Sequence, residues 1–77
     1  MTPKRYIAAV RHKGEIIFVV LEPSQVLGGR WRIGYKKPSG SYAGWRGCTE
    51  LFETREECQR RLDQEAAKRG LEEAYER

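Results

Sequence analysis

The segment from Thr54 to Gly70 carries the strongest helix signal in the chain, and it limits what the other residues can form. Thr54 and Glu57 have the spacing of a capping box, in which a hydroxyl and a carboxylate satisfy free backbone N–H groups at a helix start. Gly70 stands where a helix-ending glycine is expected. Three apolar residues follow the cap at steps of four and form one narrow stripe: Cys58, Leu62 and Ala66. A single helix with one stripe needs an apolar surface to cover, so we expect the rest of the chain to supply a sheet.

The chain has 77 residues, which allows one domain. A chain of this size buries only about 60% of its unfolded surface, so a deep active-site cavity is not expected. Its longest apolar run is Ile16 to Leu21, far short of the roughly 18 residues that span a bilayer. The apolar stretch after Tyr6 is interrupted by Arg11, too early for the core of a signal peptide. We therefore expect a cytoplasmic protein with no membrane partner.

Residues 6–12 and 15–21 are rich in Ile, Val and aromatic side chains, and Lys13-Gly14 lies between them. Two such runs around a short glycine-containing turn predict a β-hairpin. The second run is apolar at consecutive positions, so its strand needs cover on both faces or a central place in the sheet. Pro23 cannot donate to a strand ladder, and we expect the strand to end there.

Residues 30–37 alternate between apolar and polar side chains, which is typical of a half-buried strand. Trp31, Ile33 and Tyr35 share one face, which we expect to pack on the core. The other face carries Arg30, Arg32, Gly34 and Lys36.

The remaining segments give weaker signals. A turn is expected at Ser39-Gly40, residues 42–47 fit either a long hairpin loop or a short irregular strand, and residues 48–53 predict the last strand. Leu71 and Tyr75 leave the register of the helix, so residues 71–77 are expected to form a short tail, helical or frayed. The predicted fold is α+β: an antiparallel meander of three or four strands with one C-terminal helix on one face, in a single domain over residues 1–70.

Cys48 and Cys58 are the only cysteines, and one histidine accompanies them. Their spacing matches no zinc pattern, so neither a metal nor another cofactor is expected. Two buried reduced thiols are the preferred interpretation, and a disulfide is the alternative. For an enzyme such as a small basic ribonuclease, the candidate acid, base and charge stabiliser are His12, Glu15 and Arg11. Nothing else in the sequence supports that reaction, and we predict a non-catalytic protein.

Charge is divided unequally along the chain. Residues 1–54 carry nine basic and four acidic side chains, whereas residues 55–77 carry six basic and seven acidic ones. In the helix, Glu residues precede Arg residues by four positions, which predicts three ion pairs: Glu56/Arg60, Glu57/Arg61 and Glu65/Arg69. A helix with this many carboxylates is not suited to a DNA groove. The excess positive charge therefore belongs to the sheet.

The basic strand face predicts a nucleic-acid-binding site, because Arg and Lys contact phosphates or guanine and nearby rings can stack on bases. Trp45 is either an exposed ring at the edge of this face or a ring folded back on a small core. The candidate residues for binding are Arg30, Arg32, Lys36, Lys37, Trp45 and Arg46.

The stretch from about residue 31 to residue 68 resembles the arm-type N-terminal DNA-binding domain of phage and transposon integrases. The resemblance lies in Trp31-Arg32-Ile33-Gly34-Tyr35-Lys36-Lys37, the Ser39-Gly40 turn, the segment ending at Arg46, and Phe52-Glu53-Thr54-Arg55-Glu56-Glu57-Cys58 at the helix start. That family lays a three-stranded sheet, backed by one helix, in the DNA major groove. The resemblance implies groove or phosphate contacts by Arg30, Arg32, Lys36 and Arg46. It does not include the hairpin over residues 6–21, and it implies no recombination activity.

Two kinds of partner remain open at this point. A small basic protein with this face is expected to bind nucleic acid, DNA in preference to RNA. The alternative is a phage- or mobile-element-type interaction module, an inhibitor or adaptor of a larger host complex, because Trp, Tyr and Arg also dominate protein interfaces. A short meander leaves an edge strand open, which allows a homodimer.

Overall fold

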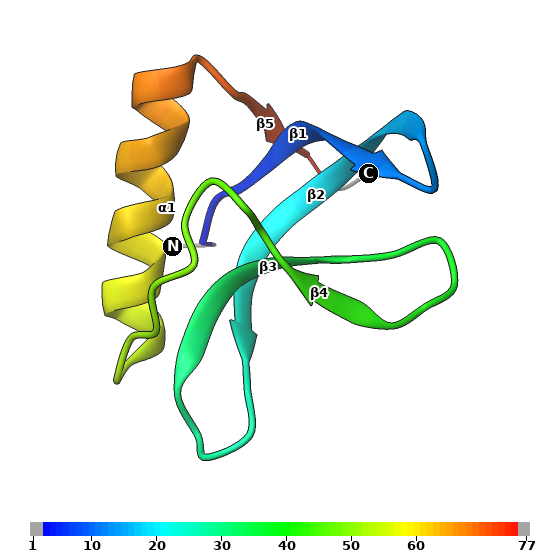
Figure 1. Ribbon diagram of the computed structural model, residues 1–77. Coiled ribbons are helices and arrows are strands. Elements are labelled where there is room, and N and C mark those ends of the chain that lie inside the picture. Colours follow the sequence, from blue (N-terminus) through cyan, green and yellow to red (C-terminus); the bar gives the residue numbers. More distant parts are fainter. Residues whose placement is uncertain (1–2, 76–77) are drawn as a thin grey trace.

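The computed structural model describes residues 3–75, which form one antiparallel sheet and one helix (Figure 1). The elements are β1 (Arg5–His12), β2 (Glu15–Gln25), β3 (Trp31–Lys36), β4 (Tyr42–Gly44), α1 (Arg55–Arg69) and β5 (Glu72–Ala74). The strands lie in the order β4-β3-β2-β1-β5, and each pairs antiparallel with its neighbour. The predicted α+β class with one helix on the sheet is confirmed, and the sheet has five strands where three or four were expected.

The first hairpin forms as predicted. Lys13 and Gly14 have φ angles of 50° and 80°, so both central turn residues are left-handed, as the tight type I′ hairpin turn requires. The turn places Tyr6 opposite Leu21, and side chains therefore alternate in step on the two strands. Tyr6 and Leu21 are buried on the face toward α1.

The second strand continues through Pro23, which corrects the expected end of this strand. Up to Leu21 it pairs with β1, and from Glu22 to Gln25 it pairs with β3. Pro23 lies opposite Ile33, whose carbonyl accepts a hydrogen bond from the Trp45 N–H at 2.9 Å, on the side away from β2. No N–H is therefore required from Pro23 in this ladder. Figure 1 shows β2 curving where it passes from one hairpin to the other.

The helix forms and ends as its caps predict. The Thr54 hydroxyl accepts a hydrogen bond from the Glu57 N–H at 3.2 Å, and Gly70 has a φ of 67°. The Leu71 N–H donates to the Ala66 carbonyl at 2.9 Å, which closes the last turn. The predicted stripe is buried, with Leu62 at 0% exposure against the sheet.

A hydrogen bond ties the helix to the first strand. The Tyr6 hydroxyl donates to the Asp63 carboxylate at 2.6 Å. Burial of the phenol and this hydrogen bond both raise the pKa of Tyr6. The sheet and the helix are thus joined by a polar contact as well as by the core.

Two predictions for the chain after β4 are wrong. Residues 48–53 form no strand: within them only Phe52 pairs with the sheet, through backbone hydrogen bonds of 2.7 and 2.8 Å with Trp31. The expected helical or frayed tail is instead β5, which pairs with Arg5, Tyr6 and Ile7 of β1. Residues 76 and 77 lie outside the described residues. The sheet edges are thus β4 and β5, each of three residues, and the homodimer stays a prediction.

Both cysteines are buried free thiols, as preferred from the sequence. Burial raises the pKa of Cys58 to about 11, with a smaller contribution from Cys48 nearby. Among the described residues, no group of three or more His, Cys, Asp or Glu side chains is placed to hold a metal ion. No helix in residues 3–75 is long and apolar enough to cross a bilayer.

Candidate nucleic-acid interface

The alternation on β3 sets the orientation of the candidate interface. Ile33 is fully buried, and Trp31 and Tyr35 are half-buried against the core, so the predicted inner face is confirmed. The side chains between them belong to the opposite face of the strand. There Lys36 is exposed and Arg32 is half-buried.

Arg32 lies against Gly44 of the neighbouring strand. A Cβ atom at Gly44 would stand 3.2 Å from the Arg32 Nη1 atom, so the absence of a side chain at Gly44 makes room for the guanidinium group. Arg32 Nε is buried and has no hydrogen-bond partner in residues 3–75. Arg32 is therefore held close to β4, whereas Arg30 and Lys36 extend into solvent.

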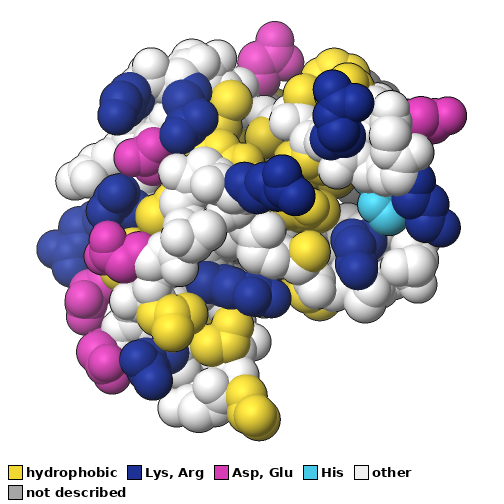
Figure 2. Space-filling model, viewed as in Figure 1, with side chains coloured by type: hydrophobic (Ala, Val, Ile, Leu, Met, Phe, Trp, Pro, Cys, Tyr) yellow, Lys and Arg dark blue, Asp and Glu magenta, His cyan; other side chains and the backbone are white. Residues whose placement is uncertain are grey.

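The predicted basic residues have no carboxylate partner. No carboxylate of residues 3–75 lies within 4.0 Å of the charged groups of Arg30, Arg32, Lys36, Lys37 and Arg46. Figure 2 shows Lys and Arg side chains across the middle of the visible face, while most of the acidic side chains in view lie along its helix side. Positive charge on the β3–β4 side is therefore not neutralised locally, whereas near β1 Arg5 contacts Glu22 at 3.7 Å and Lys4 contacts Glu73 at 3.1 Å. We call Arg30, Arg32, Lys36, Lys37 and Arg46 the free cations.

Two of the helix cations, Arg61 and Arg69, form ion pairs, unlike the free cations. Arg61 contacts Glu65 at 3.3 Å and Glu50 at 3.2 Å, and Arg69 contacts Glu65 at 3.3 Å. Of the three predicted pairs, only Glu65/Arg69 forms among residues 3–75. Glu57 is used instead at the cap, where the Thr54 hydroxyl donates to its carboxylate at 3.2 Å.

Glu65 is the centre of the helix charge network. Its burial raises its pKa, but the hydrogen bonds from Arg69 and Arg61 outweigh the burial and leave the pKa lowered. The carboxylate thus stays ionised between two guanidinium groups, in keeping with its side-chain exposure of 11%. These cations stabilise the helix and are not available to a partner.

Trp45 follows the second of its two predicted alternatives. Its side chain is only 6% exposed and folds back on the core, and the Arg69 guanidinium lies 4.8 Å from its ring centroid. Trp45 is therefore not an exposed stacking ring beside the free cations.

Two exposed aromatic rings of the sheet, Phe18 and Tyr42, were not among the predicted site residues. Phe18 is 76% exposed and Tyr42 is 50% exposed. Both line a shallow groove of about 550 Å³ that also includes Val20, Pro38 and Lys36. The signal was present, since the run from Ile16 to Leu21 is apolar on both faces and the helix covers only one. Of the two alternatives predicted for this strand, the central place in the sheet is the one found, since β2 is the middle strand of the five.

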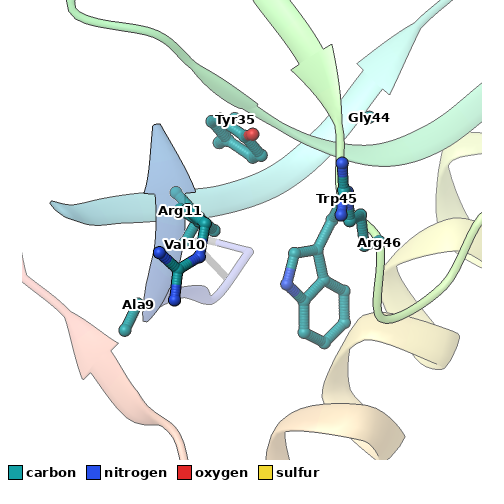
Figure 3. A pocket seen from close by; sticks show the side chains of 7 residues that line it. All are labelled: Ala9, Val10, Arg11, Tyr35, Gly44, Trp45 and Arg46. Atoms are coloured by element: carbon teal, nitrogen blue, oxygen red, sulfur yellow. The ribbon is translucent and has the colours of Figure 1, made fainter. Parts of the chain in front are cut away.

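A second hollow lies between the two hairpins (Figure 3). It has a volume of about 220 Å³ and is lined by Ala9, Val10, Arg11, Tyr35, Gly44, Trp45 and Arg46. Figure 3 shows the Arg11 guanidinium and the Trp45 ring on different sides of this hollow, with the indole nitrogen turned toward it. The contact between β1 and the segment after β4 was not predicted from the sequence.

The residues considered for catalysis do not form a convergent site. His12 and Glu15 are cross-strand neighbours at the hairpin end, and Arg11 donates to the Gly14 carbonyl at a long 3.4 Å. Within residues 3–75 no second acid or base is hydrogen-bonded to His12. Proton transfer at this turn has no geometric support.

Comparison with known proteins gives no match. No family model matches the chain, and no curated protein or solved structure shows significant similarity to it. The resemblance to integrase arm domains therefore stays a prediction, and any function has to be argued from the side chains.

Proposed function

We propose that this chain is a small non-catalytic protein of the cytoplasm that binds nucleic acid, DNA in particular, through the β3–β4 side of its sheet. The observation that supports the proposal is the set of free cations, none of which has a carboxylate partner among residues 3–75. A polyanion supplies the missing partners. Arg32 and Lys36 lie on β3, and the other three lie in the segments next to β3 and β4. Several cations close together suit a backbone with regularly spaced phosphates.

Phosphate neutralisation releases condensed counterions, so this mode of binding is sensitive to salt. We expect the affinity for a DNA duplex to fall more than about tenfold between roughly 50 and 200 mM salt. Fluorescence anisotropy of a labelled duplex measures this change. An affinity that does not change between these salt concentrations, or no binding at the lower one, contradicts the proposal.

A matched pair of triple variants tests the location of the interface. The sheet variant carries Arg30→Ala, Lys36→Ala and Lys37→Ala. The helix variant carries Arg55→Ala, Arg60→Ala and Lys68→Ala, three cations that also have no carboxylate within 4.0 Å in residues 3–75. Both variants lose three positive charges. We expect the slope of log affinity against log salt to decrease by about 2.7 in the sheet variant and by less than about 1 in the helix variant. Equal decreases contradict an interface on the sheet.

A protein partner is the second candidate function, supported by the exposed Phe18 and Ile16 at 76% and 58% exposure. Apolar groups beside unpaired cations are common at protein interfaces. A partner from host lysate that is retained after nuclease treatment and released by Phe18→Ala favours this alternative. A partner lost on nuclease treatment favours nucleic acid.

A further inference from the structure

The hollow between the hairpins is built from residues that lie far apart in the sequence. Arg11 belongs to the end of β1, Tyr35 to β3, and Trp45 and Arg46 to the segment after β4. They meet because β2 changes partners after Leu21 and carries the second hairpin around toward the first. Arg46 is one of the free cations, so this pocket adjoins the proposed interface.

The polar groups around the pocket are mainly hydrogen-bond donors. Arg11 and Arg46 are exposed and have no carboxylate within 4.0 Å among residues 3–75. The one hydrogen bond of Arg11, to the Gly14 carbonyl, occupies a single N–H at 3.4 Å. Two guanidinium groups with free donors suit an anion with several acceptor oxygens.

The Trp45 indole N–H adds a further hydrogen-bond donor to the pocket. Its side chain is 6% exposed, yet its indole N–H has no hydrogen-bond partner among the described residues. Figure 3 shows that nitrogen facing the pocket. The indole N–H is open to the pocket, so it is available as a third donor to an acceptor atom of a bound molecule.

The walls and the volume of the pocket limit the shape and size of the chemical group that carries the anion. The Tyr35 ring, the Trp45 ring edge and Val10 supply flat apolar surface. The volume of about 220 Å³ is below the range of about 300–1,000 Å³ typical of drug-sized ligands. One planar ring system with one anionic group fits these limits.

We infer that the pocket between Arg11 and Arg46 binds a single nucleoside phosphate unit with an unpaired base. The phosphate lies between the two guanidinium groups, and the base contacts Tyr35 and the indole N–H of Trp45. This inference deepens the proposed function and rests on it for the source of the nucleotide, a single strand. A duplex cannot supply an unpaired base without unstacking it, and a free mononucleotide is the other source of the same chemistry.

Nuclear magnetic resonance of the ¹⁵N-labelled protein tests the pocket directly, because the chain has two tryptophans and hence two indole N–H signals. Trp45→Phe assigns the Trp45 signal. We expect the Trp45 signal to shift saturably with deoxyadenosine monophosphate. Inorganic phosphate and deoxyadenosine, each lacking half of the unit, bind at least about tenfold more weakly. An equal effect of inorganic phosphate overturns the role of the base.

Variants then identify the groups that hold the phosphate. Arg11→Ala and Arg46→Ala each weaken deoxyadenosine monophosphate binding by about tenfold, since charge-assisted hydrogen bonds are lost. Arg60→Ala, an exposed helix arginine outside any ion pair in residues 3–75, removes the same charge and changes binding less than about twofold. Equal effects of the three variants overturn the pocket as the binding site. The backbone amide spectrum of each variant reports whether it is folded.

Oligonucleotides separate this inference from the proposed function. A single-stranded decanucleotide shifts the Trp45 signal, and its duplex does not. A stronger effect with a 5′-phosphate identifies the strand end as the source, and an equal effect identifies internal nucleotides. A further outcome is that both nucleic acids bind with the expected salt dependence while neither shifts the Trp45 signal. In that case the pocket does not bind nucleotides, and the proposed interface on the sheet is retained. If only the mononucleotide binds, the interface proposal fails and the pocket is a site for free nucleotides.

Discussion

Two basic residues of α1, Arg61 and Arg69, differ from those of the β3–β4 side in what surrounds them. Arg61 and Arg69 share Glu65, and Arg69 also lies over the Trp45 ring. The free cations of the sheet have no such partner within residues 3–75. The same side-chain types therefore contribute to folding where a carboxylate lies close, as at Arg61 and Arg69, and stay unpaired at the free cations. Net charge does not distinguish these two arrangements.

Apolar residues show the same contrast. Leu62 on α1 is fully buried, whereas Phe18 on β2 is 76% exposed. Burial of a large apolar side chain stabilises a fold, whereas an exposed one contributes little to it. The two regions thus differ both in charge pairing and in the burial of apolar side chains, and three pairs of variants test the difference.

The largest effect is expected for Leu62→Ala. Removal of a fully buried leucine leaves a cavity, and the free energy of unfolding should decrease by about 2–5 kcal/mol. Phe18→Ala should change it by less than about 0.5 kcal/mol, since Phe18 is exposed. Urea unfolding followed by circular dichroism measures both. A comparable loss in the two variants means that Phe18 is covered in solution, for example by a second copy of the chain.

An intermediate effect is expected for glycine substitutions on β3 and β4. A Cβ atom at Gly34 would stand 2.7 Å from the Ala43 carbonyl oxygen, so the backbones of the two strands must separate. We expect Gly34→Ala to lower the free energy of unfolding by about 1–3 kcal/mol.

Gly44→Ala is the matched control for this substitution. There the close atom is Arg32 Nη1 at 3.2 Å, the end of a flexible side chain that can move aside. A loss of less than about 1 kcal/mol is expected. Chemical unfolding of the two variants side by side provides the comparison, and a larger loss for Gly44→Ala means that Arg32 is fixed as firmly as backbone.

The smallest effect concerns Glu65 and pH. Its pKa in the folded protein is below the ordinary value of 4.5, so the folded state favours the ionised form. The stabilisation is complete above pH 4.5 and is lost as the pH falls through the lower pKa of the folded state. Glu65→Gln removes this pH dependence, whereas Glu56→Gln, at an exposed helix position, should leave it unchanged. Thermal unfolding between pH 7 and pH 3 measures the difference, and parallel curves for wild type and Glu65→Gln contradict the network.

The predictions that came true depend on neighbouring residues. The Thr54 cap, the Gly70 end, the Lys13-Gly14 turn and the alternation on β3 each involve residues within a few positions of one another. Hydrogen bonding and sterics over such short separations do not depend on the rest of the fold. These features were enough to predict the fold class and the orientation of the basic strand face.

The predictions that failed depend on contacts between distant segments. Pro23 remains in a strand because β1 no longer lies beside it, and the tail becomes β5 because the edge of β1 is open to it. Arg61 pairs with Glu50 because the loop before the helix approaches it. None of these neighbours is evident from spacing along the chain.

By itself the sequence determined one capped helix, one tight hairpin and one strand with opposite apolar and basic faces, because local hydrogen bonds and periodicity act over a few residues. Only the tertiary structure decided that Trp45 is buried, that Phe18 is exposed, and that Arg11 and Arg46 lie across one pocket. The physical reason is that burial and charge pairing depend on which surfaces meet, and in this chain the meeting surfaces are set by the curve of β2 between its two partners.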